Sequence, residues 1–413
     1  MELLRFLLTV FLQYSLIPIV SAFPSPLSSR DDEVFAPKVM IISMWSPEAK
    51  IWHDRLPDSK LGNLSSKTIH APGLSMLFPC ATCTEDGSIC HLTIGEGEIN
   101  SAASLMALML SPKFDFRNTY FLIAGIAGVN PKYGTLGSVA IARYSVQVAL
   151  QYEIDTRSLP PNWPTGYISY GRNQPHEYPF ITYGTEVFEL NAQLQDTAYK
   201  LASKAALADE NEPKEYRALY RHMGESYKSA SQPPSVIKCD TATSDVYYSG
   251  SRLSESFENT TKVWTNGTGL YCMSAQEDNA VLEVLVRPLQ TVNLNPTDLQ
   301  GSNFDRPPPE YTDLDHLTAA KQNGFSIAIV NIFNAGIEIV KGIIEEWDDR
   351  FKNGIRAENY IGDIFGSLGG EPDFGFGSLT RGECIAPDSK GSEMADREMN
   401  RRRILTQKSL RKI

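Results

Sequence analysis

The stretch that decides the fold covers residues 119–142 and reads TYFLIAGIAGVNPKYGTLGSVAIA. Its two apolar runs, 119–125 and 137–142, predict two buried strands. Glycine, proline and asparagine fill the segment between them, which is typical of a turn. Because a glycine after a strand lets a ligand approach the backbone closely, this turn is a candidate binding segment, although tight turns use the same residues.

Further strands and helices are predicted on both sides of this stretch. Apolar runs predict strands at 38–43 and 235–239, and helical spacing predicts helices after Gly97, at 277–286, within 323–351 and over much of 185–230. Residues 150–180 are rich in Pro, Tyr and Gly and are expected to form loops. Strands that alternate with helices favour an α/β architecture with a mostly parallel sheet.

The composition is that of an acidic globular protein. The chain has 413 residues and a formal net charge of −11, so it would repel phosphate backbones, and nucleic acid is not an expected partner. Six cysteines predict one to three disulfides if the chain is exported. Zinc is the alternative for the Cys80-x-x-Cys83 pair, but no second ligand pair follows it, so neither a metal nor a cofactor is predicted.

The N-terminus predicts export. Residues 1–22 combine Arg5, an apolar core and small residues before Phe23, which indicates a cleaved secretory signal. No later segment is expected to span a membrane, so the mature chain is predicted to be secreted, extracellular or in the cell wall. Three sequons, at Asn63, Asn259 and Asn266, are expected to carry glycans on surface loops.

Both ends of the chain differ in composition from its middle. Residues 23–36 are rich in Pro, Ser and Asp and are expected to be flexible. Residues 354–413 are first Gly-rich and then basic, which predicts a largely disordered tail. The folded domain is therefore expected to cover residues 37–353.

Five segments together resemble a known superfamily. They are IISMWSPEA (41–49), TIGEGEINSA (93–102), IAGIAGVNPKYGTLGSVAIA (123–142), ATSDVYYSG (242–250) and CMSAQEDNA (272–280). Their order and spacing resemble the nucleoside phosphorylase and nucleosidase superfamily, and in particular its fungal and bacterial purine nucleoside permease family. The resemblance covers about 37–377. It implies a three-layer nucleoside phosphorylase-like fold, with a central mixed, partly barrel-like sheet flanked by helices and a helical insertion at about 185–230.

The resemblance also implies roles for individual residues. Glu48 would polarise an attacking water, Tyr247 would stack on the base, and Glu277 would hold the ribose hydroxyls. The remaining residues expected to contact the ligand are Gly95, Ile126, Ala127, Gly128, Gln276 and Ser302, although Gln276 departs from the family pattern. Each carboxylate could instead stabilise a helix N-terminus, and Tyr247 could instead be a core aromatic.

Two residues are candidates for the group that donates to the leaving base. Asn303 stands where the nucleosidases have an acid, and an amide can donate a hydrogen bond but cannot supply a proton. Asp305, two residues later, is the alternative acid. The segment 293–300 also departs from the family pattern, because Pro296 interrupts an expected strand. Both Asn303 and Asp305 are therefore carried as catalytic candidates.

These observations predict a secreted protein that binds purine nucleosides and cleaves their N-glycosidic bond. Hydrolysis is slightly favoured over phosphorolysis because no arginine cluster for phosphate is visible. The alternatives are a non-catalytic nucleoside binding or uptake protein, and a storage or surface protein that keeps the fold without the chemistry. Phosphate as a second ligand and assembly into a homo-oligomer remain open.

Overall fold

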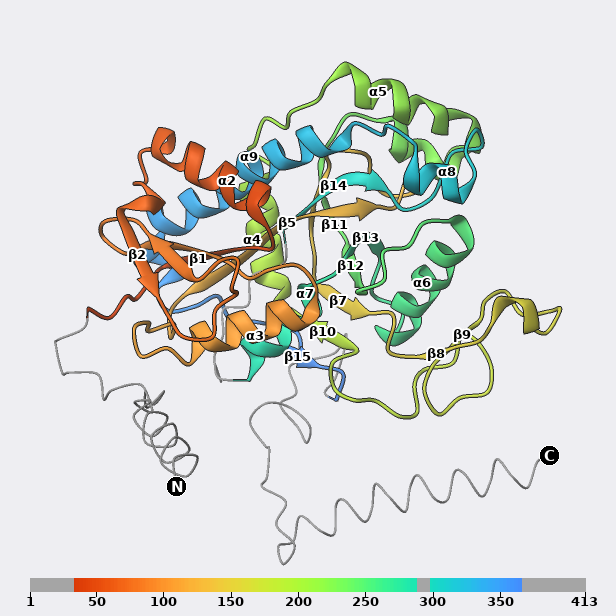
Figure 1. Cartoon of the computed structure of the whole chain (residues 1–413), viewed down its shortest axis with the longest axis horizontal. Coiled ribbons are helices and arrows are strands. Elements are labelled where there is room, and N and C mark those ends of the chain that lie inside the picture. The colour runs from red at the N-terminus through yellow and green to blue at the C-terminus, as the bar shows by residue number, and fades with distance from the viewer. Residues whose placement is uncertain (1–32, 288–297, 366–413) are drawn as a thin grey trace, which may run out of the picture. The chain divides into compact units, whose positions relative to one another are not determined.

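The computed structural model describes residues 33–287 and 298–365 (Figure 1). The longer strands are β1 (Val39–Ser43), β2 (Lys67–His70), β3 (Cys80–Cys83), β4 (Ile89–Thr93), β5 (Tyr120–Val129), β7 (Tyr144–Gln147), β12 (Asp240–Thr243), β13 (Tyr271–Ala275) and β14 (Asp298–Phe304). The shorter ones are β6 (Val139–Ile141), β8 (Tyr152–Glu153), β9 (Tyr167–Ile168), β10 (Val187–Glu189), β11 (Val236–Lys238) and β15 (Gly362–Asp363).

The α-helices are α2 (Ser46–Arg55), α3 (Glu98–Met109), α4 (Ala192–Ala202), α5 (Asn211–Ala218), α6 (Ser251–Trp264), α7 (Asp278–Val286), α8 (Asp313–Thr318) and α9 (Gly324–Glu345). Short 3-10 helices lie at Leu56–Ser59, Leu64–Ser66, Thr156–Ser158, Leu219–Met223 and Glu225–Ser231, and a π-helical turn lies at Trp347–Phe351. Helix starts have local causes: the Asn191 side chain accepts from the first backbone N–H groups of α4, for example.

The central sheet is mixed, and β5 lies at its centre. The main path runs β15-β10-β7-β12-β13-β5-β1-β4-β3-β2, while β6, β11 and β14 lie off this path. β5 pairs in parallel with β1 and β14 and antiparallel with the end of β13. The stretch that decides the fold therefore supplies both the central strand and, through β6, a second partner for β14.

Helices cover both faces of the sheet and complete three layers. Successive residues of β1 point to opposite faces, so Val39 and Ile41 belong to one apolar core and Met40 and Ile42 to another. The first core is closed by α2, α4 and α9, and the second by α3 and α7. The predicted α/β class with a central mixed sheet flanked by helices is confirmed.

The segment predicted as a helical insertion at about 185–230 begins instead with a strand. β10 pairs with β7 and β15, and its residues are buried. Three consecutive residues are too few for a periodic signal to appear in the sequence. The helices of this segment start only at Ala192. At the other end, β15 extends the fold beyond the predicted boundary at residue 353.

Helix α9 corrects the expectation that no segment after Phe23 could span a membrane. By length and composition alone, Gly324–Glu345 is long and apolar enough to cross a membrane, with a mean hydropathy of 1.7 in its most apolar window. However, 67% of that window is buried within the fold, which is typical of a core helix. Asn331, in the middle of α9, donates to Gly137 O at 2.8 Å.

Within residues 33–287 and 298–365 the structure contains two disulfides, which agrees with the prediction of one to three. Cys83 pairs with Cys90 and Cys239 with Cys272, while Cys80 is a free thiol. Among the described residues, no group of three or more His, Cys, Asp or Glu could hold a metal ion. The predicted signal (1–22), most of 23–36, Pro296, Cys384 and the tail beyond Phe365 lie outside the described residues.

Candidate functional site

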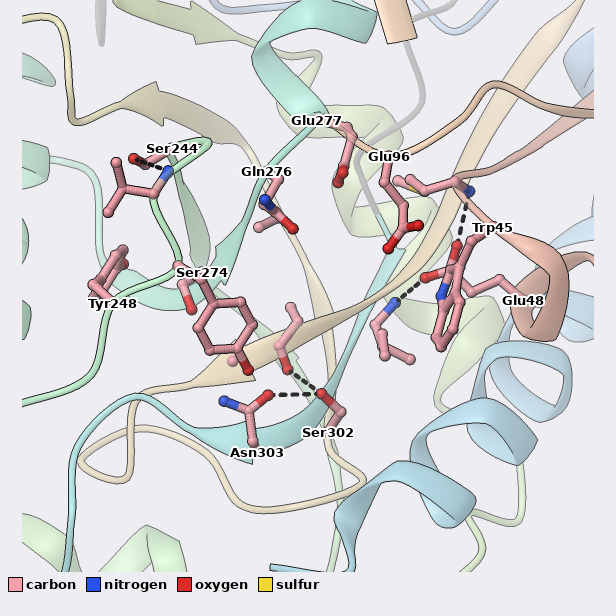
Figure 2. A pocket seen from close by; sticks show the side chains of 17 residues that line it. Trp45, Glu48, Glu96, Ser244, Tyr248, Ser274, Gln276, Glu277, Ser302 and Asn303 are labelled. Carbon is pink, nitrogen blue, oxygen red and sulfur yellow. Dashed lines mark hydrogen bonds between the residues drawn. The ribbon is translucent and has the colours of Figure 1, made fainter. Parts of the chain in front are cut away.

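A pocket of about 280 Å³ lies where several strands of the sheet end (Figure 2). It is lined by Met44, Trp45, Glu48, Glu96, Ile126, Ala127, Gly128, Ser244, Val246, Tyr247, Tyr248, Ser274, Ala275, Gln276, Glu277, Ser302 and Asn303. These residues come from β5, β13 and β14 and from the segments that follow β1, β4, β12 and β13. The fold thus brings together all five segments that carried the family resemblance, together with the end of β14.

Glu48 lies in the first turn of α2 and points into the pocket. Its Oε2 accepts a hydrogen bond from Met44 N at 2.8 Å, and its Oε1 accepts one from Ile126 N at 2.9 Å. Only 2% of the residue is exposed. Burial, with a smaller contribution from the nearby Glu277 carboxylate, raises the pKa of Glu48 to about 8 despite the opposing effect of the backbone N–H donors. Glu48 is therefore a buried base of unusual strength for a carboxylate.

Glu277 lies between the end of β13 and the first turn of α7. Its Oε1 accepts a 2.8 Å hydrogen bond from Gly97 N. Gly97 has a φ of 85°, a left-handed conformation that favours glycine, and it ends the turn before α3. Burial raises the pKa of Glu277 to about 7, helped by the charges of Glu96 and Asp245. The turn at residues 95–98 thus positions the carboxylate of Glu277, which is distant in sequence.

The charged groups of the pocket are all acidic. Among the described residues that line it, the ionisable carboxylates are Glu48, Glu96 and Glu277, and no Lys, Arg or His contributes. Just outside, Asp245 accepts from Glu98 N at 2.9 Å, and burial raises the pKa of Glu98, with the Asp245 charge adding to the rise. These carboxylates therefore disfavour the binding of an anionic ligand in the pocket.

The end of β14 brings Ser302 and Asn303 to the pocket. The register against β5 shifts between Gly301 and Asn303, so β14 is irregular where it reaches the site. The Ser302 hydroxyl donates to Ala127 O at 3.1 Å or to Asn303 Oδ1 at 2.8 Å. β14 forms as a strand beginning two residues after Pro296, so the predicted interruption does not prevent Asn303 from lining the pocket.

Tyr247 and Tyr248 follow β12 and contribute two aromatic rings to the wall. Tyr247 is 59% exposed, whereas Tyr248 is half-buried. The Tyr248 hydroxyl lies 3.0 Å from the Tyr271 hydroxyl, inside the fold. Tyr247 is therefore an aromatic surface available to a ligand, as its predicted role requires, while the Tyr248 hydroxyl is engaged with the core.

The structure does not bring Asp305 to the pocket, which corrects its prediction as the alternative acid. Asp305 is 1% exposed and accepts from Arg306 Nε at 2.7 Å and from the Tyr271 hydroxyl at 2.7 Å. The Arg306 side chain is fully buried and also pairs with Glu258 at 2.7 Å. The physical reason is that a buried guanidinium requires carboxylate partners.

Gly95 also fails to line the pocket. Its φ of 94° and a Cβ position that would lie 3.1 Å from Asn100 Cβ indicate a turn residue. The other predicted contacts, namely Glu48, Ile126, Ala127, Gly128, Tyr247, Gln276, Glu277, Ser302 and Asn303, all line it. Sequence reasoning missed Trp45, Glu96, Ser244 and Ser274 among others, although each lies within one of the five quoted segments.

Comparison with known proteins agrees with the resemblance. The family described as Purine nucleoside permease (NUP) matches residues 36–356. The chain is 41% identical over 352 residues to a purine nucleoside permease of Candida albicans, covering 83% of this chain and 84% of that protein. It is 38% identical over 345 residues to a probable purine nucleoside permease of Schizosaccharomyces pombe, covering 81% and 96%.

Among solved structures, the chain is similar to a 5′-methylthioadenosine/S-adenosylhomocysteine nucleosidase of Neisseria meningitidis in complex with methylthio-immucillin-A. The two are 14% identical with a TM-score of 0.43, and the match covers 74% of this chain and 98% of the nucleosidase.

Proposed function

The chain belongs to the purine nucleoside permease family, and from this premise we propose that its pocket binds purine nucleosides and hydrolyses their N-glycosidic bond. The observation that carries the proposal is the pair of buried carboxylates, Glu48 and Glu277, that face one pocket with raised pKa values. Paired buried carboxylates of this kind are typical of sites that perform acid–base chemistry.

In this proposal Glu277 binds the ribose. An ionised carboxylate accepts hydrogen bonds from two vicinal hydroxyls, and such charge-assisted bonds are stronger than neutral ones. One of its oxygens already accepts from Gly97 N, which fixes the orientation of the carboxylate before a ligand arrives. The sugar would thus meet an acceptor whose position does not have to be reorganised.

The purine is proposed to lie against Tyr247, beyond the ribose. Figure 2 supports separate positions for the ribose and the purine. Glu48, Glu96 and Trp45 lie on one side of the pocket, and Tyr248, Ser274 and Asn303 lie on another. Tyr247 offers an aromatic face to the base. Asn303 offers an amide N–H to a ring nitrogen.

Glu48 is proposed as the general base. Water oxygen forms the new bond to C1′, one water proton passes to Glu48, and the C1′–N9 bond breaks with its electron pair on the purine. The purine then takes up a proton, Glu48 loses one, and the net change is addition of water across the bond. The ionised form of Glu48, which predominates above its pKa of about 8, is a stronger base than an exposed glutamate.

Hydrolysis is favoured over phosphorolysis by the charges of the pocket. Phosphate would have to enter a site whose charged lining residues, within the described part of the chain, are three glutamates. Phosphate sites normally provide arginine, lysine or several backbone N–H groups. Water has no charge and meets no such barrier.

A second candidate function is nucleoside binding without cleavage, for storage or uptake. The observation that favours it is the amide at Asn303, combined with the placement of Asp305 outside the pocket. An amide at this position can donate a hydrogen bond to the departing purine but cannot protonate it.

One experiment separates these functions. Purified protein is incubated with adenosine or inosine, with and without phosphate, and free base is measured by chromatography, while calorimetry measures binding. Hydrolysis predicts free base without phosphate. Release of free base that depends on phosphate would contradict hydrolysis. Nucleoside binding without release of free base would favour the second candidate function. If neither nucleoside binds, both candidate functions are overturned.

We also propose that the chain is exported and glycosylated. The support is the signal-like segment 1–22 and the exposure of Asn63 and Asn266. Asn259 departs from the surface-loop expectation because it lies within α6, and the second threonine of its sequon, Thr261, is buried. N-terminal sequencing and glycosidase treatment of secreted protein test this proposal, and intracellular protein that retains residues 1–22 would overturn it.

A further inference from the structure

Three residues connect the pocket to a buried ion pair, and we call Tyr248, Tyr271 and Asp305 the hydroxyl relay. Tyr248 lines the pocket, and its hydroxyl lies 3.0 Å from that of Tyr271. Tyr271 donates in turn to Asp305 Oδ2 at 2.7 Å. Both Tyr271 and Asp305 are 1% exposed. The relay therefore runs from the pocket wall into the core without contact with bulk water at its far end.

The buried end fixes the direction of these hydrogen bonds. Arg306 donates to Asp305 from Nε at 2.7 Å and from Nη2 at 2.9 Å, so Asp305 is the carboxylate partner of a buried salt bridge. An ionised carboxylate only accepts hydrogen bonds, and a tyrosine hydroxyl has one proton. The Tyr271 proton is therefore engaged by Asp305, and the Tyr271 oxygen can only accept.

It follows that Tyr248 donates to Tyr271. The Tyr248 oxygen then has only lone pairs to offer on the side of the pocket. Ser274 lines the pocket next to it, and a hydrogen bond from Ser274 opposes the rise in the pKa of Tyr248 that burial causes. Because the single Ser274 proton is used in that bond, the serine oxygen also meets a ligand as an acceptor.

We propose that the hydroxyl relay fixes the pocket wall at Tyr248 and Ser274 as a hydrogen-bond acceptor, and that the pocket therefore selects purine nucleosides with an N–H group on the six-membered ring. This inference rests on the proposed function. Adenosine carries such a group as its amino group, and inosine and guanosine carry one at N1. Purine riboside has only ring nitrogens with lone pairs there.

The physical basis is the cost of an unpaired polar group. When the acceptor wall meets a ring nitrogen, two lone pairs face each other and neither is satisfied, whereas an N–H satisfies the wall. Tyr271 and Asp305 do not touch the ligand in this scheme. They are positioning residues that determine which way the Tyr248 proton points.

The test compares the affinities of adenosine and purine riboside by calorimetry. In wild type we expect adenosine to bind roughly tenfold more tightly, in the range for leaving a buried acceptor unpaired. Tyr271→Phe removes the acceptor of the Tyr248 proton, which becomes free to point at a ring nitrogen, so the ratio should fall to about one. A general packing defect would weaken both ligands and leave the ratio unchanged.

Tyr220→Phe is the matched control. Tyr220 is a fully buried tyrosine whose hydroxyl donates to Arg306 O at 2.6 Å, outside the relay. Its loss should leave the ratio at the wild-type value. If Tyr271→Phe does not fold, Tyr248→Phe serves instead, since it removes the acceptor and should also lower the ratio.

Three outcomes would overturn the inference. They are equal wild-type affinities for the two nucleosides, an unchanged ratio in folded Tyr271→Phe or Tyr248→Phe, and a changed ratio in Tyr220→Phe. All three leave nucleoside binding itself intact, so they are distinct from failure of the proposed function, in which wild type binds neither ligand.

Discussion

Gly97 and Glu277 are joined by a 2.8 Å hydrogen bond from the backbone N–H of one to the carboxylate of the other. The bond links the turn before α3 to the segment between β13 and α7. It uses one lone pair of Glu277 and leaves the others for a ligand. The carboxylate is thus held in position by the fold before it takes part in binding.

Glu277→Gln should separate ribose recognition from base recognition. The amide oxygen can still accept from Gly97, but the charge is lost, so nucleoside affinity should fall about tenfold while affinity for the free base changes little. Calorimetry with adenosine and adenine measures both. Glu283→Gln, which removes a carboxylate that pairs with Arg287 on α7 outside the pocket, is the control. Equal losses for nucleoside and base would mean that Glu277 is structural.

Glu48→Gln should abolish hydrolysis while nucleoside affinity stays within a few-fold of wild type. The amide preserves the shape of the side chain but cannot take a proton from water, and loss of a general base typically costs about 10²–10⁴ in rate. Rates of free-base release under single-turnover conditions provide the measurement. A variant with near wild-type turnover would exclude Glu48 as the base.

The free energy of unfolding should depend on pH through Glu48. Burial raises its pKa in the folded state to about 8, from an ordinary value of 4.5. Between these pH values the folded state binds a proton that the unfolded state has released. This contribution to stability is therefore fully present below about pH 4.5 and is lost as the pH rises through 8, at up to about 1.4 kcal/mol per pH unit.

Glu48→Gln cannot ionise, so the difference in unfolding free energy between variant and wild type isolates this effect. As the pH increases from 5 to 8, the variant should become more stable relative to wild type. The lost hydrogen bond adds a difference in unfolding free energy that does not depend on pH, so it does not affect this trend. Urea unfolding at pH 5, 6, 7 and 8 measures the difference. A difference that stays constant, or that shifts toward wild type, would contradict the raised pKa.

Gly128→Ala should block the pocket and destabilise the fold. A Cβ at this position would lie 2.4 Å from Ser274 Oγ, closer than atoms can approach, so the serine must move. We expect at least a tenfold loss of nucleoside affinity and a lower melting temperature. The double variant with Ser274→Ala removes the clashing oxygen and should regain much of the stability; if it does not, the clash lies elsewhere.

The parts of the fold that could be predicted from the sequence are those with long, continuous signals. β1 and β5 are unbroken apolar runs, and α9 has apolar residues at helical spacing over many turns. β10 was missed because three residues show no period, and its place in the sheet depends on β7 and β15, which are remote in sequence.

The sequence predicts a pocket residue where that residue lies in a distinctive segment. It does not predict a residue whose position depends on a buried partner. Glu48 and Glu277 could be assigned because each lies in a distinctive segment that resembles a family motif. Asp305 was misassigned because the sequence does not reveal that Arg306 is buried beside it. The direction of the hydroxyl relay depends on that same pair, and no spacing along the chain indicates it.

The pairing of β14 with β5 and β6 has a consequence for synthesis of the chain. Translation produces β5 early, but the strand that covers its second edge leaves the ribosome only after residues 130–297 have been made. Until then β5 presents a long apolar strand with an open edge, the kind of surface that pairs with other chains. A nascent chain that stops before Asp298 would therefore lack both Asn303 and the β14 partner of its central strand, so folding and ligand binding are completed by the same late segment.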